Sequence, residues 1–176
     1  MTEGAIEIEL LSPDTIDSHV SELAAMLNAC VHAGANISFV LPHSLEDSLA
    51  FWSQDVRPAV LAGTRALWVA KVGRCLAGSV QLDIGLPPNQ AHRAEVTKLI
   101  VHPDYRGRGI ARALMLALEQ RARLMERRLI TLDTANEKAE RLYLSLGYER
   151  VGTIPCFAKD PIEDRYDATT IMFKTL

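Results

Sequence analysis

Alternation of apolar and acidic residues predicts a strand near the N-terminus, over residues 6–11. The even positions are isoleucine or leucine, and Glu7 and Glu9 lie between them, which is the pattern of a half-buried strand. The Ser-Pro-Asp sequence of residues 12–14 then predicts a helix start, because serine caps helices and proline is tolerated in their first turn. Apolar residues recur every three or four positions from there to about Gly34, which predicts a helix. This apolar stripe consists of Ile16, Val20, Leu23, Leu27 and Val31.

A second helix is predicted after an irregular break over residues 31–41. Ser44 is followed three residues later by Asp47, the spacing at which a side chain and a backbone amide cap each other at a helix start. The apolar positions of this helix are Leu45, Leu49 and Trp52.

Three strands are predicted in the middle of the chain. Residues 65–72 and 75–84 are strand-like and are separated by a Gly-Arg dipeptide, so we expect them to form an antiparallel hairpin. Residues 92–101 return as a third strand of alternating apolar and charged residues. This alternation slips near Thr97 and Lys98, which predicts a bulge, and bulges often re-aim a side chain beside an active site.

A glycine-rich turn joins the third of these strands to a long helix, within residues 99–128. A His-Pro-Asp sequence stops the strand, since proline cannot donate to a strand ladder. In the following turn Gly107 and Gly109 let the backbone approach a ligand, and the helix start presents amides without intrahelical partners. With Arg106 and Arg108 beside them, these amides form a predicted site for a phosphate or pyrophosphate. The alternative is that the glycines only make a tight turn.

The turn matches neither of two common nucleotide-binding loops. It lacks the third glycine of a dinucleotide fingerprint, where Arg112 stands instead, and no Gly-Lys-Ser/Thr follows as in a P-loop. The inner stripe of the helix after it is Ile110, Leu114, Ala117, Leu118 and Met125.

The last third of the chain predicts a strand, a helix and two further strands. A short buried strand is predicted over residues 129–133. Thr134 and Glu137, three residues apart, then predict a capping box at a helix start, which puts Asn136 in the first helical turn. Gly147 closes this helix. The apolar face of the helix is Ala139, Leu142, Tyr143 and Leu146, the last strands are residues 148–153 and 169–174, and the polar loop between them is residues 157–167.

Mixed strands with helices between them predict an α/β layered fold. The chain has 176 residues, 48% of them hydrophobic and 23% charged, which fits a single globular domain over residues 1–176. Its N-terminal segment is acidic and no apolar run approaches about 18 residues, which argues against a secretory signal and a membrane span. We therefore expect a cytosolic chain without membrane contacts.

Cysteines and charges narrow the function further. Cys30, Cys75 and Cys156 are widely spaced without paired cysteines or histidines nearby, so we expect buried free thiols and no metal site. Half of the arginines fall between residues 106 and 128, a local positive patch that suits a polyanionic small ligand. Nucleic acid is a less favoured partner, because the pI is about 5.9 and no aromatic residues interleave with the basic ones.

These residues carry a resemblance to a known family. Arg106-x-x-Gly109-x-Ala111, preceded by a Leu-x-Val strand, resembles the Q/R-x-x-G-x-G/A acetyl-CoA motif of the GCN5-related N-acetyltransferases (GNAT). The segments HRAEVTKLIVHPDYRGRGIARALM, LDT, AERLYLSLGYERVGTIP and TTIMFKTL are more narrowly similar to tabtoxin-resistance-type acetyltransferases. The resemblance runs with gaps from about Val31 to the C-terminus. It implies a mixed, mostly antiparallel sheet of six to seven strands flanked by about four helices.

The resemblance also implies an acetyl-CoA site. In the family, the glycine turn binds the cofactor pyrophosphate, and the strand before it pairs with the pantetheine amides. Asn136 matches an asparagine that contacts the cofactor near the pantetheine, and Tyr143 stands where the family has a general acid for the CoA sulfur. The implied cofactor-binding residues are Leu99, Ile100, Val101, Arg106, Gly107, Arg108, Gly109, Ile110, Ala111, Asn136 and Tyr143.

Moving an acetyl group to an amine needs a deprotonated amine, a stabilised oxyanion and a proton for the departing thiolate. A free alkyl amine has a pKa of about 10.4, so a carboxylate base raises its reactive fraction. Glu95 and Asp133, on the strands beside the glycine turn, are the candidate bases, directly or through water. Alternatively, Asp133 caps the next helix, Glu95 pairs with a nearby cation and Tyr143 is a core residue. A backbone amide of residues 99–101 is the candidate oxyanion donor.

The acceptor is expected to be a primary amine of a small molecule, and the resemblance suggests an amino-acid-like toxin or antibiotic. No activated Ser or Cys can be recognised, so direct transfer in a ternary complex is favoured. Because the loop between the first two helices helps to shape the acceptor pocket in the family, the resemblance makes His32, Asn36, Phe39 and Trp52 candidate substrate contacts. The alternatives are a core role for Trp52 and a solvated loop position for His32.

Two other functions remain open at this point. One is a non-catalytic acyl-CoA-binding or sensing module, and the other is acetylation of protein N-termini or lysines. A narrow pocket walled by residues 31–41 would argue against a protein acceptor. The resemblance also suggests a homodimer, because many relatives dimerise through their late strands.

Overall fold

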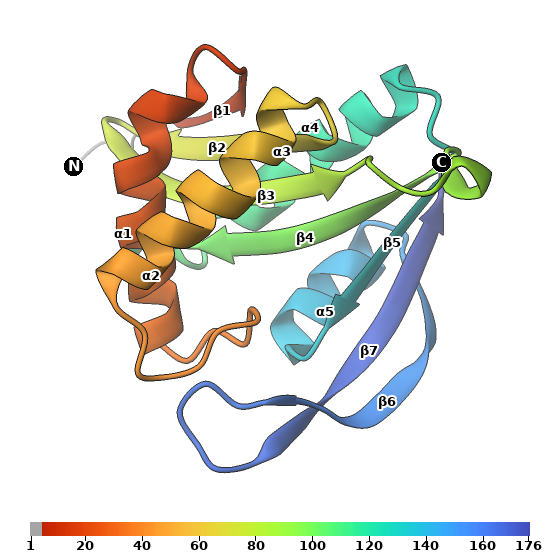
Figure 1. Cartoon of the computed structure of the whole chain (residues 1–176). Helices are drawn as coiled ribbons and strands as arrows, with labels where there is room; N and C mark the ends of the chain where they lie inside the picture. The colour runs from red at the N-terminus through yellow and green to blue at the C-terminus, as the bar shows by residue number, and fades with distance from the viewer. Residues whose placement is uncertain (1–4) are drawn as a thin grey trace.

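The central element of the computed structural model is a seven-stranded sheet in the order β1-β2-β3-β4-β5-β7-β6 (Figure 1). The structure describes residues 5–176, so the first four residues of the acidic N-terminal segment lie outside the described residues. Neighbouring strands are antiparallel except β4 and β5, which run parallel, so the predicted mixed, mostly antiparallel sheet is confirmed. The strands are β1 (Ile6–Leu11), β2 (Arg65–Val72), β3 (Cys75–Asp83), β4 (Arg93–Val101), β5 (Leu129–Thr134), β6 (Glu149–Lys159) and β7 (Tyr166–Thr175).

Helices cover both faces of the sheet (Figure 1). Side chains of β2 alternate between two cores, with Leu67 and Val69 in the core under α1 and Trp68 and Ala70 in the core under α4. One face carries α1 (Val20–His32), α2 (Leu45–Ala50), the π-helical η2 (Phe51–Val56) and α3 (Arg57–Leu61), and the opposite face carries α4 (Ile110–Leu124) and α5 (Glu137–Ser145).

The middle strands follow the predicted pattern closely. β2 and β3 form the expected hairpin, with Gly73 in the left-handed region at its turn. The expected bulge is also present, because Gln81 of β3 pairs with Thr97 and Ser79 pairs with Ile100. Two residues of β4 thus face one residue of β3, and Lys98, one of those two, has a φ of +50°.

The chain after β1 differs from the predicted helix start at Ser12. The backbone N–H of Thr15 donates to the Ser12 carbonyl at 3.1 Å, and the Ser12 N–H donates to the Thr15 hydroxyl at 2.9 Å, which makes a closed turn. A short 3₁₀ turn, η1 (Ile16–His19), follows, and α1 begins only at Val20. The Ser-Pro-Asp signal therefore builds a turn rather than a helix cap.

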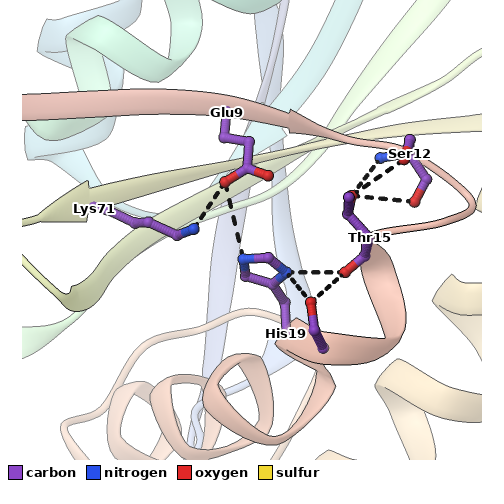
Figure 2. A network of polar contacts seen from close by, with 6 residues as sticks. Glu9, Ser12, Thr15, His19 and Lys71 are labelled. Atoms are coloured by element: carbon purple, nitrogen blue, oxygen red, sulfur yellow. Dashed lines mark hydrogen bonds and ion pairs between the residues drawn. The ribbon is translucent and has the colours of Figure 1, made fainter.

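A small polar network fixes this turn against the sheet (Figure 2). The Nε2 atom of His19 lies 3.9 Å from a carboxylate oxygen of Glu9, which also accepts a hydrogen bond from Lys71 Nζ at 2.8 Å. Because Glu9 and Lys71 belong to the paired strands β1 and β2, the network ties the start of α1 to the edge of the sheet.

One predicted helix cap is confirmed and another is wrong. Ser44 and Asp47 form the complete capping box at the start of α2. At α5, however, Asn136 itself is the N-cap, and its Oδ1 accepts hydrogen bonds from the amides of Lys138 and Ala139 at 2.8 and 3.1 Å. The Thr134 hydroxyl instead accepts from the Asn136 amide, so Asn136 precedes the first helical turn.

The last two strands are longer than the sequence pattern predicted. β6 and β7 take in residues 157–159 and 166–167, so the predicted polar loop shrinks to residues 160–165 at the tip of a long hairpin. The strand register shifts between Ile154 and Ala158. This shift interrupts the alternation of apolar and polar residues by which a longer strand could have been predicted from the sequence.

The cysteine prediction is confirmed in part. Among the described residues all three are free thiols, but only Cys30 is buried, whereas Cys75 and Cys156 are exposed. Cys75 begins a strand at a hairpin and Cys156 lies in a bulged edge strand, where side chains face solvent. Over residues 5–176, no helix has the length and apolar character needed to cross a membrane.

Candidate functional site

The candidate site begins where the two parallel strands separate. β4 and β5 pair only through Arg93, Ala94 and Glu95 on one side and residues 129–131 on the other. Beyond these pairs the two strands diverge (Figure 1). The later residues of β4 therefore have no hydrogen-bonding partner in β5, and this free edge of β4 faces the gap. Backbone amides and carbonyls at such an edge are available to a ligand.

A cavity of about 1050 Å³ occupies this gap. It runs from the glycine turn, along the end of β4, to the loop after α1 and the bulged part of β6. It is open to solvent at its surface and bounded by five separate segments of the chain. Its lining includes residues 33–38, 96–101, 105–107, 109–112, 133–139 and 141–143, together with Cys30, Phe157, Ala158 and Thr169.

The glycine turn forms one end of the cavity. Gly107 and Gly109 have φ values of +80° and +81°, a region that an L-residue enters only with strain. Gly109 is the N-cap of α4, whose first-turn amides have no intrahelical acceptors, and space around both glycine Cα atoms is open. Free amides of this kind at a helix start, with Arg106 beside them, are the groups that bind anions in other proteins.

Arg108 behaves differently from its neighbour Arg106. Its guanidinium donates to the Asp104 carbonyl at 3.3 Å and lies 5.1 Å from the centre of the Tyr105 ring. Arg108 does not line the cavity, although Arg106 does. The structure therefore brings ten of the eleven predicted cofactor-binding residues to one cavity and leaves Arg108 outside it.

Asp133 and Tyr143 both line the cavity, and the charge of Asp133 acts on the Tyr143 phenol. The Thr169 hydroxyl donates a hydrogen bond to Asp133 Oδ2 at 2.8 Å, which fixes the carboxylate at the end of β5. Tyr143 is 5% exposed, and burial raises the pKa of its phenol well above the usual range, with the negative charge of Asp133 adding to the rise. A phenol in this state stays protonated near neutral pH and is a weaker acid than a free tyrosine.

Glu95 lies outside the cavity. Its neighbours Ala94 and Val96 pack into the core under α4, so Glu95 belongs to the opposite face of β4. It lies where β4 and β5 still pair, and its carboxylate accepts a hydrogen bond from Arg93 at 3.1 Å. This is the ion pair that the sequence left open as an alternative.

Of the four candidate substrate contacts, only Asn36 lines the cavity. Its side-chain amide donates to Asp167 at 3.2 Å. His32 is exposed and bonded to the Asn28 carbonyl. Phe39 packs against Phe51, and Trp52 is a residue of the core under α1 with 1% exposure.

Thr169 and Lys98 are among the cavity residues that the sequence patterns did not predict. Thr169 donates a hydrogen bond to Asp133 and lies at the predicted start of the last strand. Nothing in the sequence around Thr169 indicates that Asp133 is its partner. Lys98 lies in the bulge that the slip of alternation did predict, so the signal for its altered direction was present in the sequence.

Comparison with known proteins identifies the family. A profile of the Acetyltransferase (GNAT) family matches residues 31–148, which include β4, the glycine turn, α4 and α5. The chain belongs to the GNAT acetyltransferase family. It is an acyltransferase, and acetyl-CoA is the co-substrate of the family.

Individual relatives agree with this assignment. The chain is 32% identical over 136 residues to an N-acetyltransferase from the hisH-hisA intergenic region of Azospirillum brasilense, a match that covers 76% of each chain. It is 31% identical over 101 residues to N-acetyltransferase 8F1 of Rattus norvegicus, covering 56% of this chain and 46% of the relative. The chain therefore spans under half of the rat protein.

Solved structures share the GNAT fold. A GCN5-related N-acetyltransferase from Kribbella flavida superposes with a TM-score of 0.76 at 23% identity, covering 98% of both chains. A candidate acetyltransferase from Salmonella typhimurium, solved with its cofactor acetyl-CoA, superposes with a TM-score of 0.76 at 19% identity, covering 98% of this chain and 94% of that one. The fold expected from the sequence is confirmed.

The residues of the cavity fit acetyl-CoA. The glycine turn offers open space and amide donors for a pyrophosphate, and the edge of β4 beyond Glu95 offers strand-like groups for an amide-containing arm. Asp133 and Tyr143 lie further along the same cavity, where the thioester end would reach.

Proposed function

We propose that this chain moves the acetyl group of acetyl-CoA to a primary amine of a small molecule, by direct transfer in a ternary complex. The observation that carries the proposal is one cavity holding an anion cradle at one end and Asp133 beside Tyr143 further along. The proposed cofactor contacts are those that line this cavity, including Asn136.

Asp133 is the proposed base. It lines the cavity, whereas Glu95 is paired with Arg93 outside it, so the geometry favours Asp133 of the two candidates. The carboxylate, directly or through a water molecule, takes a proton from the ammonium form of the acceptor. The freed nitrogen then attacks the thioester carbonyl, and a backbone amide of residues 99–101 is proposed to stabilise the oxyanion.

Tyr143 is the proposed acid. As the C–S bond breaks, its hydroxyl gives a proton to the departing thiolate, whose usual pKa of about 8.5 is lower than that of a phenol. Burial, which raises the Tyr143 pKa, keeps the phenol protonated until the thiolate forms, but it also makes the phenol a weaker acid. The second proton that the acceptor nitrogen loses as the intermediate collapses restores the phenol. The core role that the sequence left open is compatible with its position on the apolar face of α5.

The acceptor end of the cavity supports a small molecule. The loop after α1 contacts the β6–β7 hairpin, because the Leu41 amide donates to the Pro161 carbonyl at 2.9 Å and Asn36 donates to Asp167. These contacts join the loop after α1 to the hairpin beside the cavity, which favours a small acceptor over a protein chain. An amino-acid-like toxin or antibiotic, as in the tabtoxin-resistance-type enzymes, is the acceptor we propose.

A panel of amines tests the proposal. Release of CoA thiol from acetyl-CoA is measured with amino-acid-like toxins, free amino acids, aminoglycosides, polyamines and short peptides. Turnover with small amines supports the proposal. Turnover confined to peptides would instead identify a protein acetyltransferase, and binding of acetyl-CoA without turnover on any amine would identify a sensing module.

A further inference from the structure

Lys98 and Ser38 form an unusual pair on the wall of the cavity. The bulge in β4 gives Lys98 a φ of +50°, and Ser38, in the loop after α1, has a φ of +81°. They are two of four non-glycine residues with positive φ among residues 5–176, and Lys98 Nζ donates a hydrogen bond to the Ser38 hydroxyl at 2.8 Å. Backbone strain of this kind persists where the surrounding structure holds a side chain in a required position.

The lysine has only neutral close partners. Among the described residues no carboxylate lies within ion-pairing distance of Lys98 Nζ, which donates to the Ser38 hydroxyl and lies 5.9 and 6.0 Å from the centres of the Phe39 and Phe51 rings. Burial lowers the Lys98 pKa, and this exceeds the opposing effect of the Asp133 charge. A partly desolvated cation without a paired anion is costly in a folded protein, and a bound anion would offset that cost.

The cofactor phosphates are an unsuitable partner for this cation. The glycine turn that cradles an anion follows residues 99–101, so at about 3.3 Å per strand residue it lies roughly 10 Å or more beyond Lys98. Lys98 instead lies beside Ser38 and close enough to Asp133 for the charge of Asp133 to affect its pKa. The part of the cavity wall beside Ser38 therefore carries the Lys98 cation, within reach of the Asp133 charge.

We propose that Lys98, positioned by Ser38, binds a carboxylate of the acceptor, so that the acceptor is an amino acid or a close analogue with its amine toward Asp133. This inference rests on the proposed function, because it assigns a role in recognising the acceptor of the same reaction. A carboxylate held by a charge-assisted hydrogen bond contributes roughly a 10- to 100-fold preference over an uncharged analogue.

Matched pairs of ligands test this assignment. The affinity of the CoA-bound protein is measured by calorimetry for the standard L-amino acids and for their primary amides, which differ only in the charge of the carboxyl group. The amine of the amide is less basic than the amine of the acid. A preference for the acid therefore cannot be attributed to a more reactive amine. We expect at least one acid to bind about 10-fold or more tightly than its amide.

Three variants locate the effect. Lys98→Met should reduce the preference for acids to about twofold or less, whereas Lys98→Arg should retain most of it. Lys71→Met removes the same charge outside the cavity, where Lys71 pairs with Glu9, and should behave like the wild type. Equal affinity for acids and amides, no acid binding at all, or weakened CoA binding in Lys98→Met would each overturn the assignment.

Turnover of the same ligands separates this inference from the proposed function. Equal acetylation of acids and amides by the wild type would reject the role of Lys98 and leave the acetyltransferase activity standing. Selective binding of acids through Lys98 without acetylation would support the anion site and reject the proposed reaction.

Discussion

The Thr169 hydroxyl donates a 2.8 Å hydrogen bond to Asp133 across strands β5 and β7, and both residues line the cavity. This contact leaves the second carboxylate oxygen of Asp133 available to the cavity that Asp133 lines. It gives the carboxylate a fixed direction, which a base for an incoming amine requires.

Replacement of Asp133 should therefore slow acetyl transfer. Asp133→Asn preserves an acceptor for Thr169 but removes the base, and we expect kcat/KM near neutral pH to fall about 100-fold. The loss should shrink as pH rises, because the acceptor amine then loses its proton without help. Glu95→Gln is the comparison variant, with an expected effect below about threefold, since Glu95 lies outside the cavity. A larger loss in Glu95→Gln than in Asp133→Asn would assign the base to Glu95.

Tyr143→Phe should separate catalysis from cofactor binding. Loss of the hydroxyl removes the proton donor for the thiolate, so kcat should fall roughly 100-fold while the Kd for acetyl-CoA changes by less than about threefold. Tyr148→Phe is the control, because Tyr148 is also buried and its ring lies 5.7 Å from that of Tyr143, but it does not line the cavity. Unchanged kcat in Tyr143→Phe would show that Tyr143 has only its core role.

The glycine turn offers a test of cofactor binding. Gly109→Ala adds a Cβ in the left-handed region, which should cost about 1 kcal/mol of stability and disturb the anion cradle. We expect the Kd for acetyl-CoA to rise about 10-fold, measured by calorimetry. Gly73→Ala, at the β2–β3 hairpin, introduces the same strain with equally open surroundings and should leave that Kd unchanged. A matching rise in both variants would mean that strain alone causes the effect.

A buried ion pair links the long helix to the sheet. Lys174 of β7 bonds to Glu119 of α4, and both side chains are largely buried. Lys174→Met leaves the Glu119 carboxylate without its cation, so urea denaturation should show a loss of about 3–5 kcal/mol in the free energy of unfolding. The double variant Lys174→Met with Glu119→Leu should recover much of that loss. A loss below about 1 kcal/mol in the single variant would contradict this account.

The sequence predicts the part of the site that local patterns encode. Gly107 and Gly109 mark the turn because their backbone angles exclude most other residues, and the slip at Thr97 and Lys98 marks the bulge because it breaks a period of two. Ser44 and Asp47 similarly reveal a cap that closes on itself within three residues. Each of these features depends on residues that are close in the chain.

The remaining features depend on contacts between distant segments. Whether Glu95 reaches the cavity is decided by where β4 and β5 separate, and no residue of either strand signals that point alone. Asn136 and Thr134 both carry suitable capping oxygens, so the choice between them depended on the backbone at the end of β5. Thr169 is joined to Asp133 only by the register of β5 with β7.

The most direct test of the central claim follows the acetyl group itself. The protein is incubated with acetyl-CoA labelled in its acetyl group and with the most active amine of the panel, and both protein and small molecules are analysed by mass spectrometry. The account predicts the label on the nitrogen of the small acceptor and none on the protein chain. Label that accumulates on the chain, on added peptides alone, or nowhere but in acetyl-CoA would contradict direct transfer to a small amine.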